Sequence, residues 1–355
     1  MKILPSTAAP GEGKIGGMKT ASFQKPLGGG KVQCLLCPHG CVLAEGGTGR
    51  CRVRKVLGGT LRALAADKVV ALHLDPVEKK PLYHVFPGAP VLSFATVGCN
   101  LSCRFCQNAS ISQFRGDPPP GDPLSAEEIV ERAHTNRCPA VAATYTEPTV
   151  FFELAREVGL AARARGILNL WVTNGFISTQ AGADLAGWLD GANVDLKSMR
   201  DETYREYCGG RLAPVLETIE GLHRRGVWVE VTTLVIPGMN DSPEELREAA
   251  RFLASLSPDI PWHVTAFHPD FRMLDRGPTP AGKLIEAVEI GREEGLRFVY
   301  PGNVRIRGGG DTLCPSCGDV VIRRSGFALE ANRLRGGACP GCGTKIAGIW
   351  EMAAG

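Results

Sequence analysis

The sequence has few of the features that mark membrane, secreted or nucleic-acid-binding proteins. No apolar run approaches the roughly 20 residues that a membrane span needs, and no basic start leads into the apolar segment of a secretory signal peptide. The 40 basic residues are nearly balanced by 37 acidic ones, which argues against a dedicated nucleic-acid surface. We therefore expect a cytoplasmic protein, with neither membrane nor nucleic acid among its partners.

Cysteine, in contrast, is abundant, with 13 residues in a chain of 355. Without secretion, disulfides are not expected, and clustered cysteines indicate metal ligands. Eleven of the thirteen fall into three clusters. Cys138 and Cys208 stand apart, and we expect them to be packed thiols, with a role left open for one that lies near a site.

The middle cluster is the most informative. Cys99, Cys103 and Cys106 have the spacing C-x3-C-x2-C and follow the apolar segment 91–98. Iron–sulfur cubanes usually have four thiolate ligands. Three ligands leave one iron open for a substrate or cofactor. A structural zinc knuckle is the alternative, but zinc usually takes four ligands in paired halves, and no fourth cysteine or histidine is near.

Strand-like and helix-like segments alternate through residues 91–306. The short apolar runs are residues 91–97, 140–145, 168–173, 192–196, 227–236, 262–267 and 296–300. Amphipathic helical segments lie between them, one starting at Ser125 with a capping box to Glu128, another at Ser242 followed by Pro243. This alternation predicts an α/β fold with a parallel sheet, closed into a partial (β/α)6-type barrel.

The segments outside this region differ in composition. Residues 1–30 are rich in glycine, serine, threonine and proline, and we expect a mobile tail. Residues 31–90 form a cysteine-rich N-terminal segment, within which residues 61–90 are expected to be a short two-stranded or irregular segment leading into the main domain. Residues 307–355 begin with a glycine-rich linker and end in a cysteine-rich tail.

Polar residues follow the predicted strands, where barrels of this type collect their functional groups. Glu147 offers a negative partner for a cation, and Asn174 follows the next strand. Asp195 and Lys197 are two residues apart, so both side chains lie on one face. His263 lies within the sixth apolar run. A helix-capping role for Glu147 and a buried ion pair of Asp195 with Lys197 are the structural alternatives.

The three-cysteine motif after an apolar strand resembles the signature of the radical S-adenosylmethionine (SAM) enzymes. The order and spacing of further runs resemble the radical SAM member of the AmmeMemoRadiSam group, which is similar to the pyruvate formate-lyase activating enzymes. These runs are residues 78–84, 93–99, 106–108, 144–149, 193–197, 230–238, 261–269 and 299–303. The resemblance covers roughly residues 31–350 and implies that the predicted barrel is a radical SAM barrel.

The resemblance implies a [4Fe–4S] cluster on Cys99, Cys103 and Cys106. In the family, the amine and carboxylate of SAM chelate the fourth iron, and an electron from the cluster cleaves SAM to a 5′-deoxyadenosyl radical. It also implies an electron donor of the flavodoxin or ferredoxin type. The target is a glycine backbone of a partner enzyme, a small metabolite or a modified residue, and a Memo-like protein is a candidate partner.

The resemblance also suggests how SAM is held. Glu147 would meet the methionyl ammonium, although Tyr-Thr precedes it where the family usually has Gly-Gly. Asn174 would bond the ribose hydroxyls. Lys197, with Asp195 beside it, would meet the SAM carboxylate, and His263 would reach SAM from below.

The first cysteine cluster comprises Cys34, Cys37, Cys41 and Cys51, with three glycines between the last two. Four thiols and glycine-rich turns can close a pocket around either zinc or an auxiliary iron–sulfur cluster. The auxiliary cluster could pass electrons, whereas zinc could only stabilise the fold. The residue pattern leaves both possibilities open.

The last cluster has two Cys-x2-Cys knuckles separated by 21 residues, each followed by a glycine. Its members are Cys314, Cys317, Cys339 and Cys342. This pattern is typical of a zinc ribbon, with a rubredoxin-like iron as the variant. A metal would stabilise a tail that has little apolar content of its own.

The leading hypothesis is an oxidoreductase that reductively cleaves SAM and abstracts a hydrogen atom. Its rivals are a non-catalytic iron–sulfur or zinc scaffold and an electron-transfer protein that does not consume SAM. The three-thiol motif argues against both rivals, because a scaffold or an electron carrier would favour fully ligated metal.

Overall fold

The computed structural model describes residues 18–351 of the chain. Most of the predicted mobile tail, residues 1–17, lies outside the described residues. The rest of that tail was predicted wrongly, because it contributes strands β1 (Lys19–Thr20) and β2 (Gln24–Leu27) to two small N-terminal sheets. Backbone hydrogen bonds to β6 and β3, whose bounds follow below, hold these strands in place.

Seven parallel strands form the centre of the molecule, side by side in the order of the chain. They are β8 (Pro90–Thr96), β10 (Ala140–Ala143), β11 (Leu168–Thr173), β12 (Gly191–Asp195), β13 (Trp228–Val235), β14 (Trp262–Ala266) and β15 (Val299–Gly302). Each of the seven predicted apolar runs overlaps one of these strands. The α/β class is confirmed.

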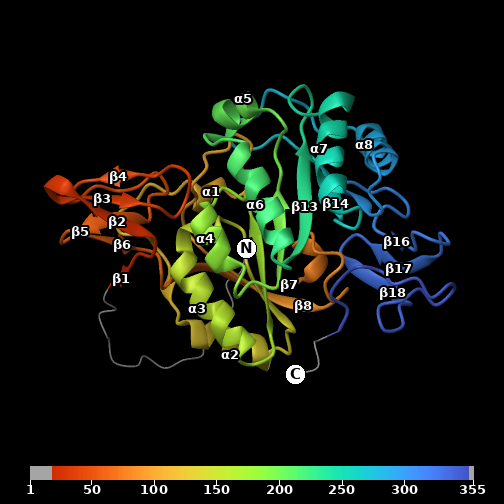
Figure 1. The fold of residues 1–355 in the computed structure, drawn as a ribbon, viewed down its shortest axis with the longest axis horizontal. Helices are drawn as coiled ribbons and strands as arrows, with labels where there is room; N and C mark the ends of the chain where they lie inside the picture. Colours follow the sequence, from red (N-terminus) through yellow and green to blue (C-terminus); the bar gives the residue numbers. More distant parts are fainter. Residues whose placement is uncertain (1–17, 352–355) are drawn as a thin grey trace.

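Helices follow the strands and cover the outer face of the sheet (Figure 1). The longer ones are α2 (Ala126–Thr135), α3 (Phe152–Arg163), α4 (Thr179–Leu185), α6 (Ala213–Arg224), α7 (Pro243–Leu256) and α8 (Ala281–Glu293). Shorter ones are α1 (Ala109–Ser112), α5 (Asp201–Thr203), the π-helical turn η4 (Tyr204–Cys208) and the 3-10 turns η1 (Gly28–Gly30), η2 (Val77–Lys79) and η3 (Pro148–Phe151).

The predicted helix starts are confirmed in detail. The Ser125 hydroxyl accepts from the Glu128 N–H, and the Glu128 carboxylate accepts from the Ser125 N–H, which completes the capping box. The Ser242 hydroxyl caps α7 by accepting from the Glu245 N–H at 3.2 Å, with Pro243 in the first turn. These local contacts are coded within four residues of sequence, so they could be read without the fold.

The main sheet begins earlier than expected. Strand β7 (Lys68–Pro76) pairs antiparallel with β8, and the short β9 (Asp122–Pro123) pairs with β7 at the edge. The segment 61–90, expected to be a short two-stranded or irregular lead into the main domain, contains a nine-residue strand of the main sheet itself. Its alternation of buried and partly exposed residues is interrupted by a register shift between Val69 and Ala71, which obscures the pattern in the sequence.

Two cysteine-bearing units flank the sheet at opposite ends of the molecule (Figure 1). The N-terminal unit contains one sheet of β2, β3 (Lys31–Cys34) and β4 (Val42–Leu43), and a second of β1, β5 (Arg54–Leu57) and β6 (Thr60–Ala63). The C-terminal unit contains β16 (Thr312–Leu313), β17 (Val320–Ser325) and β18 (Ala328–Asn332).

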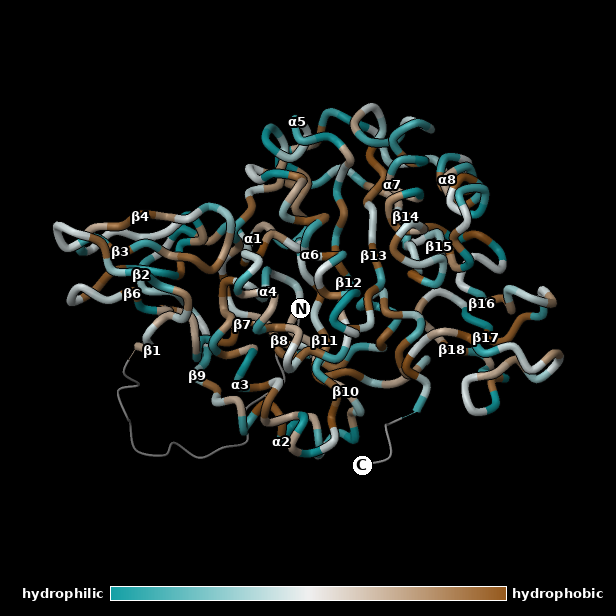
Figure 2. The backbone as a smooth tube through the Cα atoms, viewed as in Figure 1, coloured by the Kyte–Doolittle hydropathy of each residue, from teal (hydrophilic) through white to brown (hydrophobic). Residues whose placement is uncertain are grey.

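The core lies between the sheet and its helices. The hydrophobic strands run through the middle of the molecule, while hydrophilic segments lie mainly on the outer turns and helices (Figure 2). Trp171 and Trp262 are fully buried against this layer. Among residues 18–351, no helix is long and apolar enough to cross a membrane.

Candidate active site

The three-cysteine loop leaves the carboxyl end of β8 and is held by the turn η4. The Ser102 N–H donates to the Cys208 carbonyl at 2.8 Å, and the Arg104 N–H donates to the Tyr207 carbonyl at 2.9 Å. A π-helical turn is often found at a functional site. The backbone contacts give the loop a defined shape even though it has no regular structure of its own.

The thiols of this loop have hydrogen-bond partners and a wide spacing. Cys99 Sγ accepts from the Leu101 N–H at 3.4 Å and from Asn174 Nδ2 at 3.6 Å, and Cys106 Sγ lies 3.1 Å from Ser112 Oγ. Such contacts to sulfur tune the potential of an iron–sulfur cluster. Cys103 is buried, and the other two cysteines are half-buried.

The distances between the three sulfur atoms distinguish a site for a single metal ion from a site for an iron–sulfur cluster. Among the described residues, a group of three or more cysteine, histidine or carboxylate ligands with all ligand atoms within 4.8 Å of one another occurs only in the C-terminal unit. The thiols of Cys99, Cys103 and Cys106 are therefore spread more widely than the sulfurs around one zinc, which lie about 3.8 Å apart because each Zn–S bond is about 2.3 Å. In a cubane each thiolate bonds a different iron. The residues present fit a [4Fe–4S] cluster.

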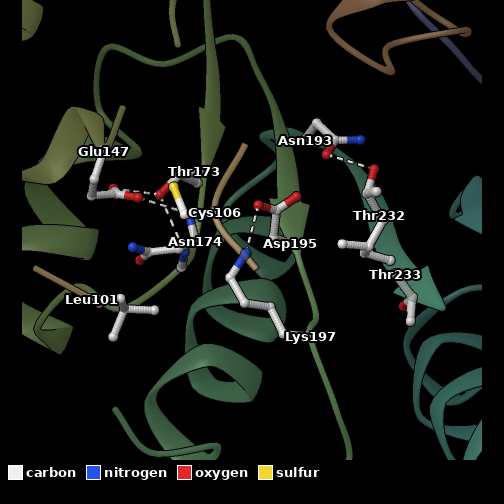
Figure 3. A network of polar contacts seen from close by, with 12 residues as sticks. Leu101, Cys106, Glu147, Thr173, Asn174, Asn193, Asp195, Lys197, Thr232 and Thr233 are labelled. Carbon is white, nitrogen blue, oxygen red and sulfur yellow. Dashed lines mark hydrogen bonds and ion pairs between the residues drawn. The ribbon is translucent and has the colours of Figure 1, made fainter. Parts of the chain in front are cut away.

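Glu147 lies on the loop between β10 and η3, and its side chain contacts the end of β11. Its buried carboxylate accepts from the Thr149 N–H at 3.0 Å and from Thr149 Oγ1 at 2.6 Å. It also accepts from Thr173 Oγ1 at 2.7 Å and from the Asn174 N–H at 2.8 Å (Figure 3). Burial raises the pKa of Glu147, and these donors oppose the shift. The carboxylate also caps η3, so the structural alternative weighed from the sequence is present.

Asn174 extends this network to the cysteine loop. Its Nδ2 group donates to Asn100 Oδ1 at 2.9 Å, and its Oδ1 accepts from the Phe176 N–H at 2.8 Å. Together with the contact to Cys99 Sγ, these bonds fix the amide between the end of β11 and the first cysteine of the loop. The structure thus brings Glu147, Asn174 and the predicted metal ligands together.

Asp195 ends β12 and Lys197 lies two residues further on, across the site from Glu147 and Asn174 (Figure 3). Lys197 Nζ donates to Asp195 Oδ2 at 2.9 Å, and a third of the Asp195 side chain remains exposed. Burial alone would lower the pKa of Lys197. The Asp195 carboxylate and the Cys103 and Cys208 thiols beside it outweigh burial and raise that pKa, so Lys197 is a fixed positive charge next to the cysteine loop.

Comparison with known proteins identifies the family to which this chain belongs. Residues 94–253 match the Radical SAM superfamily. An uncharacterized protein of Methanocaldococcus jannaschii is 40% identical over 332 residues, which cover 93% of this chain and 99% of that protein. This chain belongs to the radical SAM superfamily. Membership implies a [4Fe–4S] cluster and SAM, as predicted.

Two proteins named as activating enzymes are more distant relatives of this radical SAM protein. The benzylsuccinate synthase activating enzyme of Thauera aromatica is 26% identical over 223 residues, 57% of this chain and 66% of that enzyme. The isethionate sulfite-lyase activating enzyme of Oleidesulfovibrio alaskensis is 29% identical over 146 residues, 40% of this chain and 45% of that enzyme. Membership in the AmmeMemoRadiSam group stays a prediction from the sequence.

His263 lies in a second polar network of this radical SAM protein. Its Nε2 atom is 2.7 Å from Glu230 Oε2, and its ring packs between those of Tyr83 and Tyr300. His263 pairs in register with Thr232, which pairs with Asp195 one strand further along the sheet. No hydrogen bond joins His263 to the other predicted SAM residues among the described residues, and its contact with SAM stays a prediction.

Two features of the radical SAM site were missed from the sequence. The Cys208 thiol lies beside the Cys103 thiol, and their hydrogen bond lowers the pKa of Cys103 and raises that of Cys208. Tyr145 has a backbone φ of +63°, a conformation that a glycine of the usual Gly-Gly would adopt freely. Its hydroxyl donates to Asp75, which also pairs with the buried Lys80 at 2.6 Å.

The C-terminal cysteines of this radical SAM protein form a compact group. Cys314 Sγ is 3.5 Å from Cys342 Sγ, and Cys317 Sγ is 3.7 Å from Cys339 Sγ. All four sulfurs lie within 4.8 Å of one another. These distances are close to the sulfur–sulfur separation around one tetrahedral ion, about 3.8 Å, so this group could hold a single metal.

Proposed function

We propose that this radical SAM protein reductively cleaves SAM and abstracts hydrogen from a protein or small-molecule substrate, in the manner of a glycyl-radical activating enzyme. The observation that carries the proposal is the loop of Cys99, Cys103 and Cys106 between a fixed cation and a polar network at the carboxyl ends of β8, β11 and β12. When bound there, the cluster and SAM supply the electron and the 5′-deoxyadenosyl radical.

In this proposal the protein's own residues bind SAM and orient it. Lys197 is held by Asp195 and offers its charge to the carboxylate of SAM. Asn174, fixed by Asn100 and Glu147, would bond the ribose hydroxyls of SAM. Because the oxygens of Glu147 are already engaged by protein donors, we assign it a positioning role, with its negative charge favouring the methionyl ammonium.

The distant likeness to two activating enzymes supports the type of chemistry and leaves the substrate open. We assign zinc to Cys314, Cys317, Cys339 and Cys342, since their compact geometry suits one tetrahedral ion. An electron donor of the flavodoxin or ferredoxin type is part of the proposal. A Memo-like partner stays a prediction from the sequence.

The test is anaerobic reconstitution with iron and sulfide, followed by SAM and dithionite. We expect 5′-deoxyadenosine and methionine to form in equal amounts, together with a change in the electron paramagnetic resonance (EPR) signal of the reduced cluster when SAM is added. The matched control is Cys103→Ala, which removes one ligand and should abolish both signals. An intact wild-type cluster that yields no 5′-deoxyadenosine would contradict the proposal.

A further inference from the structure

The N-terminal cysteines line a cavity of their own. Cys34 ends β3, Cys37 and Cys41 lie on the loop that follows it, and Cys51 lies on the turn before β5; all four border one cavity. Backbone bonds from Cys34 N–H to the Cys41 carbonyl at 2.9 Å and from Gly40 N–H to the Cys37 carbonyl at 3.1 Å hold the loop closed. The four thiols therefore face a shared, built space.

The spacing of these thiols differs from that of the C-terminal group. In the C-terminal group, all four sulfurs lie within 4.8 Å of one another, as around a single ion. No three of the N-terminal sulfurs satisfy the same limit, although the four line one cavity. A single zinc needs sulfurs about 3.8 Å apart, whereas an iron–sulfur cluster divides its four thiolates among two or four irons. The sulfur spacing of the N-terminal group therefore differs from that of the C-terminal group, which suits a single ion.

Arg54 gives a second and independent indication. Its side chain is fully buried and borders the cavity, with Nη2 paired to Glu153 at 2.6 and 2.8 Å. Its Nε atom has no hydrogen-bond partner among the described residues. A buried N–H without an acceptor is rare. The thiolates and sulfides of a cluster would supply both an acceptor and negative charge opposite this cation.

His39, the histidine beside the cavity, does not serve as a metal ligand in place of one of the cysteines. His39 borders the cavity, but its Nε2 atom is 2.7 Å from the Asn100 carbonyl oxygen and its Nδ1 atom is 3.1 Å from Arg50 Nη1. Both ring nitrogens are engaged elsewhere. The four thiols are the ligand set.

The cavity adjoins the active-site loop through the residues on both sides of Cys99. Gly98, with φ +101°, packs so closely that a Cβ there would lie 2.8 Å from the Cys51 carbonyl oxygen. Asn100 borders the cavity and donates its side chain to the Phe176 carbonyl, while its Oδ1 accepts from Asn174, which contacts Cys99 Sγ. A short chain of packed and hydrogen-bonded groups thus joins the two cysteine sites.

We propose that Cys34, Cys37, Cys41 and Cys51 hold a second iron–sulfur cluster that passes single electrons to the cluster on Cys99, Cys103 and Cys106. The relay rests on the proposed function, whereas the presence of the second cluster does not. A low-potential one-electron donor reduces the second cluster by one electron, and transfer to the active-site cluster reoxidises it. No bond or proton changes at the N-terminal site.

The first test counts metals in the anaerobically reconstituted full chain. Cys37→Ala/Cys41→Ala should lose about two or about four irons with the same number of sulfides, and its zinc content should not change. Cys317→Ala/Cys342→Ala, the matched control in the C-terminal group, should lose about one zinc and keep its iron. Loss of zinc, or of a single iron without sulfide, from the N-terminal variant would overturn the proposal.

A second variant guards against misfolding of the first. Cys103→Ala/Cys106→Ala leaves the N-terminal site untouched and should retain about two or about four irons with sulfide. Absence of iron and sulfide from this variant, with zinc retained as a sign of folding, would also overturn the proposal.

EPR of the reduced protein tests the relay. Two neighbouring paramagnetic clusters should broaden each other's signals in the wild type, and either double variant should show one narrow signal. Equal line widths in all three proteins would contradict the relay. Failure of the proposed function is separate, because it is read from 5′-deoxyadenosine formed by dithionite-reduced wild type.

Discussion

Replacing Arg324 by methionine should destabilise the protein by about 3–5 kcal/mol, because it leaves a buried carboxylate unpaired. Arg324 on β17 is fully buried and donates to Glu78 Oε1 at 3.2 Å, to the Tyr83 carbonyl at 2.6 Å and to Thr312 Oγ1 at 2.9 Å. Without the guanidinium, the Glu78 carboxylate keeps only the Gly88 N–H as a donor, at 2.9 Å. This loss would remove a large part of the roughly 5–15 kcal/mol that stabilises a typical protein.

Urea unfolding followed by tryptophan fluorescence measures the effect, because Trp350 packs against the same region, 5.3 Å from the ring of His84. With a urea dependence of about 3 kcal/mol per molar, the midpoint should fall by about 1–2 M. The control is Arg323→Met, at the exposed neighbouring position on β17, which should change stability by at most about 0.5 kcal/mol.

A double variant separates the unpaired charge from lost packing. Glu78→Leu combined with Arg324→Met removes both charges and should recover part of the stability lost in the single variant. The reasoning is refuted if Arg324→Met is as stable as Arg323→Met. An equally large loss in the double variant would show that the unpaired carboxylate is not the cause.

Four further predictions concern the site and the C-terminal unit. Lys197→Met should weaken SAM binding by about tenfold or more, the cost of one lost ion pair of about 1.5–3 kcal/mol, in equilibrium dialysis with iron content unchanged. Cys208→Ala should keep the full iron content and SAM cleavage, and loss of iron would show that Cys208 is a fourth ligand. Cys314→Ser/Cys342→Ser should lose about one zinc by elemental analysis and lower the urea midpoint. Burial lowers the pKa of His84 to about 4 in the folded protein, whereas in the unfolded chain this histidine is protonated below about pH 6.5. The unfolded state therefore binds more protons in this range, so the free energy of unfolding should fall by about 2 kcal/mol between about pH 7.5 and 5. His84→Gln should flatten that part of the profile of urea midpoint against pH.

The sequence predicted the elements that depend on neighbours along the chain. The strands follow short apolar runs, and the capping residues Ser125 and Ser242 act within one turn of helix. The cysteine loop could be located as well, since its spacing is local. These features need no knowledge of what packs against them.

Contacts between distant segments could not be predicted in this way. Cys208 lies beside Cys103 because η4 packs on the cysteine loop, a contact that no spacing encodes. The occupied oxygens of Glu147 depend on Thr173 and Asn174 from the next strand. A motif can show that a carboxylate lies at the site, but only the fold shows which donors have already engaged it.

The C-terminal unit is joined to the turn η2 beside the central sheet through the ion pair of Arg324 with Glu78, and this restricts how related proteins can vary. A shorter relative without the unit would expose the turn from residue 78 to residue 84 and leave its acidic side chain with no cation. In such a relative water would solvate a carboxylate at this position, so residue 78 would be free to vary, whereas a chain with the unit must keep the acidic residue that pairs with Arg324. Aligned sequences with and without the two Cys-x2-Cys knuckles should therefore divide at residue 78 as well.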